Sequence, residues 1–283
     1  METIKQALKE EGVPRELSDS EIEKLLSDQC ISTFQRNKLE REAKKNWDLF
    51  YKRNKNNFFK DRHWTTREFT ELLTDQTIDE EKQISNKVLL EVGCGVGNFI
   101  FPLIETGCKY FFLACDFSPV AIDILKRNPL YNEEKCKAFV ADITDKSTFV
   151  NSIDSFGYIG NIDIISLVFV LSAISPDKMS NAVDNLFEVL RPGGIVLFRD
   201  YGIFDHAMIR FSEGHKISDN FYVRQDGTRA FYFTKKNVME LFTKSGFQMI
   251  SNEFVRKETV NKKEGISVPR IFIQSKFCKP KDL

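Results

Sequence analysis

From residue 87 onward the chain alternates between short apolar runs and stretches with helical spacing. Five nearly continuous apolar runs come first, at 87–92, 110–115, 135–141, 162–171 and 194–199. The helices expected between them cover 98–105, 119–127 and 176–190. Continuous apolar strands separated by helices indicate a parallel sheet that is covered on both faces. The pattern therefore predicts an α/β fold.

After the fifth run an insert interrupts the alternation of strands and helices, and the residues that follow the insert complete it. Residues 200–233 form an insert in which Gln225-Asp226-Gly227-Thr228 predicts a hairpin with an Asp-Gly turn. A helix over 234–245 and strands over 247–255 and 268–277 follow. The expected total is seven strands, whereas a dinucleotide-binding fold has six. The insert leaves from the carboxyl end of the sheet, where open α/β folds bind their ligands.

The first 80 residues differ in character and are expected to form a helical extension to a domain of residues 81–283. The Ser-Asp-Ser-Glu sequence at 18–21 is a capping box that opens a short helix. Apolar residues recur at helical spacing over 31–50, and residues 54–67 combine aromatic with polar side chains.

Charge is balanced in total but unevenly distributed. Lys+Arg and Asp+Glu both number 41, yet residues 36–67 hold eleven basic and four acidic side chains. Residues 256–281 hold eight basic and two acidic side chains. The neutral total argues against a general polyanion binder, whereas two basic segments provide a local footprint for phosphates. A solvated lysine-rich surface is the plainer alternative.

Cysteine spacing and the chain's N-terminal residues bear on metal and location. The six cysteines form no C-x-x-C pair and have no histidine at ligand spacing, so no structural zinc is expected. The acidic N-terminus lacks an apolar core and resembles neither a secretory signal nor a mitochondrial presequence. No run approaches the length of a membrane span. We expect a cytoplasmic protein, with the nucleus as a second compartment, and no metal or membrane partner.

A glycine-rich turn, Glu91-Val-Gly93-Cys-Gly95-Val-Gly97-Asn98, joins the first strand to the first helix. Glycine permits a tight turn and close approach of the backbone to a ligand, and the helix start offers unpaired N–H groups. The third glycine comes one residue earlier than in the NAD fingerprint. With an acidic residue ahead of it, the turn resembles that of class I S-adenosylmethionine-dependent methyltransferases. Gly93, Gly95 and Gly97 are thus expected to bind this cofactor.

Polar and apolar residues at the next strand ends support the same cofactor. Asp116 ends the second strand, 23 residues after Gly93, where a carboxylate can accept hydrogen bonds from both ribose hydroxyls. Asp142 and Ile143 end the third strand and are expected at the adenine, with Val168 and Phe169 of the fourth strand on the floor of the pocket. A glycine cluster alone would fit any turn between a strand and a helix. The two further acidic residues, Asp116 and Asp142, favour a cofactor site over that alternative.

Several segments carry a more specific likeness: 46–54, 57–65, 115–119, 198–202 and 222–229. They resemble the tRNA N3-methylcytidine methyltransferases of the methyltransferase-like family, and the likeness runs from about Gln35 to Phe277. Residues 258–265 most resemble the branch that acts on serine tRNAs. The resemblance implies a Rossmann-like seven-stranded fold with an RNA-binding helical extension, and S-adenosylmethionine as cofactor. It also implies tRNA modification at cytidine 32 of the anticodon loop, assisted by seryl-tRNA synthetase.

The resemblance assigns Trp47 and Tyr51 to the cofactor pocket, although packing of an amphipathic helix also explains them. Unpaired anticodon-loop bases stack on aromatic and arginine side chains, and basic residues pair with phosphates. The residues assigned to these contacts are Phe58, Phe59, Arg62, His63 and Trp64. Burial in the core is an alternative for Phe59 and Trp64. From the insert, the substrate-binding candidates are Tyr201, Arg210 and Arg224.

Cytosine N3 is nucleophilic in the neutral base, so the enzyme must unpair the base, exclude water and align N3 with the methyl group. A carboxylate near the base would stabilise its developing positive charge, and the catalytic candidates are Asp200 and then Asp205. For His206 a structural role is the better interpretation. The alternatives are a methyltransferase of another RNA, a protein or a small molecule, and an RNA-binding pseudoenzyme. The basic and aromatic segments disfavour a non-RNA substrate, and the intact glycine turn disfavours the pseudoenzyme.

Overall fold

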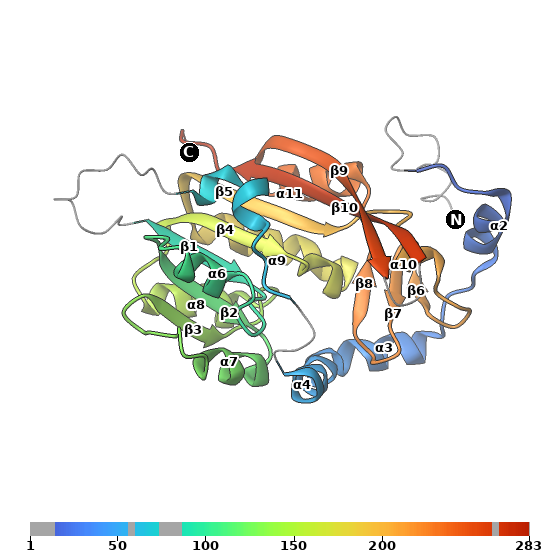
Figure 1. Ribbon diagram of the computed structural model, residues 1–283, viewed down its shortest axis with the longest axis horizontal. Helices are drawn as coiled ribbons and strands as arrows, with labels where there is room; N and C mark the ends of the chain where they lie inside the picture. The colour runs from blue at the N-terminus through green and yellow to red at the C-terminus, as the bar shows by residue number, and fades with distance from the viewer. Residues whose placement is uncertain (1–14, 56–59, 74–86, 262–265, 283) are drawn as a thin grey trace.

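The computed structural model describes residues 15–55, 60–73, 87–261 and 266–282, which form a seven-stranded sheet flanked by helices (Figure 1). The strand order is β3-β2-β1-β4-β5-β10-β9. The mutually parallel strands are β1 (Val88–Val92), β2 (Phe111–Asp116), β3 (Cys136–Val140), β4 (Ile162–Val168) and β5 (Leu190–Tyr201). Strand β10 (Ile266–Cys278) lies antiparallel between β5 and β9 (Gln248–Asn261). The predicted α/β fold class is confirmed.

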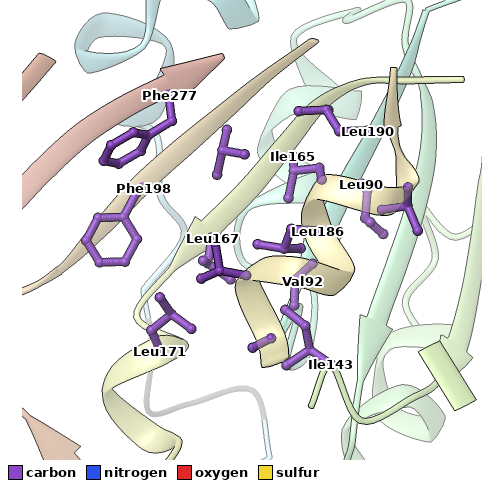
Figure 2. Packing of buried hydrophobic residues seen from close by; sticks show 14 of the residues in the cluster. Leu90, Val92, Ile143, Ile165, Leu167, Leu171, Leu186, Leu190, Phe198 and Phe277 are labelled. Atoms are coloured by element: carbon purple, nitrogen blue, oxygen red, sulfur yellow. The ribbon is translucent and has the colours of Figure 1, made fainter. Parts of the chain in front are cut away.

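Helices cover both faces of the sheet, as continuous apolar strands require. Those on one face are α8 (Lys146–Ser155), α9 (Pro176–Val189) and α11 (Lys235–Lys244). Those on the other are α5 (Thr65–Glu68), the 3-10 turn η1 (Thr70–Leu72), α6 (Ile100–Glu105) and α7 (Pro119–Lys126). Figure 2 shows Leu186 of α9 lying among Leu167 and Val92 of the sheet. All three side chains are essentially inaccessible to solvent.

The insert and the N-terminal helices lie beside the carboxyl end of the parallel strands (Figure 1). The insert contains α10 (His206–Ile209) and a small sheet of β6 (Lys216–Ser218), β7 (Phe221–Val223) and β8 (Arg229–Phe231). The N-terminal helices are α2 (Asp19–Ser27), α3 (Thr33–Arg41) and α4 (Ala43–Asn54). Leu25 of α2 packs in one apolar cluster with the insert, and α4 packs against α7. The part of the chain before β1 is therefore tied to both the insert and the sheet.

Local predictions are confirmed at two positions. Ser18 and Glu21 form the capping box of α2 through reciprocal hydrogen bonds. The Asp-Gly turn joins β7 to β8, with Gly227 at φ 81° and the Asp226 carboxylate accepting from the backbone N–H of Thr228 at 2.9 Å. The domain boundary near residue 80 stays a prediction, since 74–86 lie outside the described residues.

Three elements differ from expectation. Helix α8 was not predicted; Asp145 caps it by accepting from the backbone N–H of Ser147, and its buried apolar side chains are few. The helix expected over 31–50 is two helices, because Glu42 has φ −92° and ψ 3° and interrupts the regular geometry. Strand β5 begins at Leu190 rather than at residue 194. None of the described helices is long and apolar enough to cross a membrane.

Replacing Leu167 by alanine is expected to lower the free energy of unfolding by about 2–5 kcal/mol, because the fully buried side chain leaves a cavity in the centre of the sheet. Leu130→Ala is the control, since Leu130 is 37% exposed and its loss should change stability by less than about 0.5 kcal/mol. Urea denaturation of both variants measures the difference. Equal losses in the two variants would contradict this description of the core.

Candidate active site

The turn after β1 is formed by glycines in left-handed backbone conformations. Gly93, Gly95 and Gly97 have φ of 62°, 55° and 94°. A Cβ atom on Gly93 would lie 2.5 Å from a methyl carbon of Val170, and one on Gly95 would lie 2.9 Å from the hydroxyl oxygen of Tyr51. These glycines are required both for the backbone conformation and for the close approach of neighbouring side chains.

Asp116 ends β2 beside this turn. Its carboxylate oxygens accept hydrogen bonds from the backbone N–H groups of Gly95 and Ser118, each at 2.9 Å. Burial raises the pKa of Asp116 to about 6, although these two hydrogen bonds lower it. The Ser118 hydroxyl donates in turn to Asp48 of α4 at 2.5 Å. The carboxylate is thus fixed between the glycine turn and the start of α7, with α4 close by.

A cavity of about 340 Å³ opens at this edge of the sheet, and we call it the cofactor cavity. Such a volume suits a small-molecule ligand. Strand ends form one wall and helices α3 and α4 form the roof. The predicted cofactor residues that line it are Trp47, Tyr51, Gly93, Asp116, Asp142 and Ile143.

The other predicted cofactor residues lie nearby but outside this cavity. Gly95 lines the adjoining cavity, and Gly97 lies in the turn against Phe101. The side chain of Val168 is 2% exposed and belongs to the core, whereas the next residue, Phe169, lines the cavity. For Val168 the expectation of a pocket floor is wrong, because its side chain is buried in the core where β4 ends, whereas Phe169 follows the strand with φ 61° and reaches the cavity.

A second cavity of about 340 Å³, the inner chamber, adjoins the first and shares Tyr51, Phe169 and Arg229 with it. Its walls also include Arg62 and Glu91. Glu91 is 3% exposed, burial raises the pKa of its carboxyl well above the usual value, and Arg62 opposes this shift. Among the described residues, Glu91 Oε2 has no hydrogen-bond partner. The chamber therefore offers an unpaired carboxyl oxygen beside a guanidinium.

A third cavity, the outer pocket, has a volume of about 830 Å³. It shares Tyr201, Arg224 and Asp226 with the inner chamber, so the three cavities adjoin one another in series. The basic and histidine side chains that line it are Arg53, His206, Arg210, His215, Arg224 and Arg270. The predicted substrate residues Tyr201, Arg210 and Arg224 are thus brought together, and the pocket suits an anionic ligand.

The two carboxylates expected to act in catalysis are both fully buried. Asp200 accepts hydrogen bonds from the backbone N–H groups of Ser172 and Tyr201, each at 2.9 Å, and burial raises its pKa to about 6. Asp205 accepts from the side chain of Arg270 at 2.9 Å and also caps α10. Neither lines any of the three cavities. Both carboxylates accept hydrogen bonds that hold neighbouring segments, and a catalytic role for either stays a prediction.

The remaining substrate candidates separate into three groups. Phe58 and Phe59 lie outside the described residues, and His63 is exposed and lines none of the three cavities. Trp64 packs against the core with its ring 4.3 Å from the guanidinium carbon of Arg199. Trp64 is thus partly buried, as its alternative explanation expects, and its contact with RNA stays a prediction.

Glu40 and Arg229 also line the cofactor cavity, although neither is among the residues predicted for it. They form an ion pair although 189 residues separate them. No local pattern predicts such a pair. The signal that could have found Arg229 is its place at the end of the segment 222–229, which already carried the family likeness.

Comparisons with known proteins agree with this geometry. A family model described as a methyltransferase domain matches residues 62–252. Human tRNA N(3)-cytidine methyltransferase METTL6 is 52% identical over 267 residues, covering 94% of this chain and 91% of that protein. The Xenopus tropicalis METTL2 enzyme of the same description is 37% identical over 273 residues, covering 86% and 80%.

Solved structures support the fold. Burkholderia thailandensis 1,6-didemethyltoxoflavin-N1-methyltransferase, solved with S-adenosylhomocysteine, matches with a TM-score of 0.54 at 12% identity, covering 89% of this chain and 92% of that one. The fold is that of class I S-adenosylmethionine-dependent methyltransferases. Among the described residues, no group of three or more metal-ligand side chains is found.

Asp116→Ala is expected to abolish measurable binding of S-adenosylhomocysteine, because the acceptor for the ribose hydroxyls is lost. In the unaltered protein, protonation of Asp116 below its pKa of about 6 removes the same acceptor. Affinity should therefore be constant from about pH 7 to 8 and about tenfold weaker near pH 5. Calorimetry across this range measures it, with the exposed Asp123→Ala as control. Unchanged affinity in Asp116→Ala would contradict the assignment.

Proposed function

Because this chain belongs to the tRNA N(3)-cytidine methyltransferase family, we propose that it methylates N3 of cytidine 32 in the anticodon loop of serine tRNAs. S-adenosylmethionine is the cofactor of this family's fold, and the cofactor cavity fits it in volume and in the position of Asp116. The observation that carries the proposal is the series of three adjoining cavities. They provide a path from a basic outer pocket to the methyl donor.

The residues proposed to hold the cofactor come from four segments that meet at one edge of the sheet. The glycine turn would approach its methionine part, and Asp116 would accept from the ribose hydroxyls. The proposed set is Trp47, Tyr51, Gly93, Gly95, Gly97, Asp116, Asp142 and Ile143, in which Gly97 shapes the turn. The roof formed by Trp47 and Tyr51 would exclude water from the reacting atoms.

The inner chamber is the proposed site of the target base. An enzyme that acts on a base must take it out of the stack, and a loop base is unpaired already. The rings of Phe169 and Tyr201 lie 5.1 Å apart by centroid on its wall and offer an apolar surface for stacking. Arg62 can donate to the cytosine O2, and the unpaired oxygen of Glu91, in the ionised form that Arg62 favours, can accept from the exocyclic amine. Uracil lacks that amine, so this arrangement favours cytosine.

The reaction does not require a strong general acid or base from the protein. Cytosine N3 has an in-plane lone pair, and bound S-adenosylmethionine supplies an electrophilic methyl group. The chain's contribution is to orient N3 and exclude water. Asp200 contributes indirectly, since it holds the backbone of Ser172 and Tyr201, both of which line the inner chamber. Asp200 is therefore proposed as a positioning residue.

The outer pocket is the proposed contact for the tRNA backbone. Arg53, Arg210, Arg224 and Arg270 line it, and guanidinium groups recognise phosphates by paired hydrogen bonds. Further exposed cations lie along α3 and α4 next to the roof of the cofactor cavity. Affinity for tRNA is therefore expected to fall steeply as salt concentration rises.

Asp200→Asn is expected to lower kcat by up to about 100-fold while leaving S-adenosylhomocysteine affinity unchanged. The asparagine side chain has one oxygen and one NH₂ group, so it can accept from only one of the two backbone N–H donors. The NH₂ group would face the other donor, and the chamber wall at Ser172 or Tyr201 would shift. Single-turnover methylation and calorimetry measure the two quantities. Asp184→Asn, an exposed position on α9, is the control. A loss confined to cofactor affinity would contradict the positioning role.

The decisive assay incubates the purified protein with unmodified serine and threonine tRNAs, with and without seryl-tRNA synthetase. Nucleoside mass spectrometry should detect N3-methylcytidine in serine tRNA, at a higher level when the synthetase is present. The serine preference and the synthetase partner rest on the likeness of residues 258–265, of which 262–265 lie outside the described residues.

Parallel reactions with a labelled methyl donor test protein and small-molecule extracts. Label in these fractions and none in RNA would overturn the proposed substrate. Binding of S-adenosylhomocysteine without any methylated nucleoside would instead indicate an RNA-binding protein that lacks turnover.

A further inference from the structure

Helix α3 forms part of the roof of the cofactor cavity, yet it buries none of its side chains. Its neighbour α4 differs, since Phe50 and Tyr51 are buried and pack against Val96 and Ala121. Hydrophobic burial therefore anchors α4 but does not anchor α3. Beyond its direct connection to α4 through Glu42, α3 is held by polar contacts.

The polar contacts converge on Glu40, near the C-terminal end of α3. Its carboxylate forms an ion pair with Arg229 of β8 and another with Lys178 of α9, the latter at 2.5 Å. Burial raises the pKa of Glu40, but the hydrogen bonds from Lys178 and Arg229 outweigh it and leave the pKa lowered. The carboxylate is thus charged at neutral pH and joins three elements that are distant in sequence.

Arg229 depends on Glu40 in turn. The residue is 6% exposed, and its Nη2 donates to the backbone oxygen of Ala173 at 3.1 Å. Ala173 ends η2 (Leu171–Ala173), the 3-10 turn that follows β4. A buried guanidinium that loses its carboxylate partner is strongly destabilised where it lies. Removing the Glu40 charge should therefore displace Arg229 as well as release α3.

Arg229 also lines both the cofactor cavity and the inner chamber. The ion pair is thus located where the two proposed ligands meet. On the same helices, Arg41 and Lys44 line the cofactor cavity, and Lys38, Lys45 and Lys52 are exposed. Whatever fixes α3 over the cofactor cavity also fixes Lys38 and Arg41 of α3 relative to the inner chamber, next to the α4 cations that the burial of Phe50 and Tyr51 already holds.

We propose that Glu40, Arg229 and Lys178 form a polar latch that fastens α3 over the cofactor cavity and couples cofactor binding to tRNA binding. This inference rests on the proposed function. A cofactor held under the fastened roof stabilises the arrangement of cations that tRNA contacts, and bound tRNA stabilises the closed roof. Because coupling between two binding sites is reciprocal, each ligand raises the affinity for the other by the same factor. The three residues are positioning residues.

The test measures S-adenosylhomocysteine affinity by calorimetry, and tRNA affinity with and without S-adenosylhomocysteine. In the unaltered protein, S-adenosylhomocysteine is expected to tighten tRNA binding about fivefold or more. Glu40→Gln should weaken S-adenosylhomocysteine binding and reduce the coupling factor to nearly one. Lys178→Gln should act in the same direction but less, since it leaves Arg229 paired. Glu40→Asp, which retains the charge, should restore part of the coupling.

Glu42→Gln is the matched control, because Glu42 pairs with Lys45 at 3.7 Å and lines none of the three cavities. Thermal unfolding identifies any variant that loses its fold, and α4 is expected to keep Glu40→Gln folded. Unchanged S-adenosylhomocysteine affinity and unchanged coupling in folded Glu40→Gln would overturn the latch. The cofactor measurement requires no RNA, so it tests the latch even if the protein proves not to modify tRNA.

Discussion

The hydrogen bond from the Gly95 N–H to Asp116 joins the turn after β1 to the end of β2, and the site is arranged around it. Parallel pairing places the two strand ends side by side, and a second bond from the Cys94 N–H to the oxygen of Cys115 holds them there. Burial disfavours the charged form of this carboxylate and raises its pKa to about 6. Ligand hydroxyls that donate to it would stabilise the charged form. The edge is thus built to gain stability when its ligand binds.

The same edge cannot enclose a ligand by itself, and the roof comes from distant segments. Helix α4 packs on α7 through its aromatic side chains, and Asn46 of α4 donates to the backbone oxygen of Gly227 in the β7–β8 turn at 3.0 Å. The Asn46 amide also fills the space that a Cβ atom on Gly227 would occupy. The N-terminal helices and the insert therefore contact each other as well as the sheet (Figure 1). Their junction closes the cofactor cavity and bounds the inner chamber.

The sequence predicts the sheet and the glycine turn because both depend on local periodicity and on glycine's backbone freedom. Helix α8 was missed because few apolar residues mark its buried face among serine, threonine and asparagine. The direction in which a side chain points at the end of a strand is harder to predict, since a shift of one residue moves the side chain to the other face of the sheet. On β5, Asp200 therefore faces the backbone N–H groups of Ser172 and Tyr201, while the side chain of Tyr201 lines the chamber. No local sequence pattern indicates that Glu40 pairs with Arg229 and Lys178.

Aromatic rings position two of the cations that lie along the path between the cavities. Arg62 lies over the ring of Phe169 at 5.5 Å, and Arg224 lies over Tyr201 at the same distance. An aromatic face attracts a guanidinium and also holds its plane in one orientation. The cations are thus positioned by rings as well as by acidic partners, and a chain with no net charge can still present an ordered cationic path. Under the proposed function, a base that enters this path would stack on the same rings that orient the guanidinium groups.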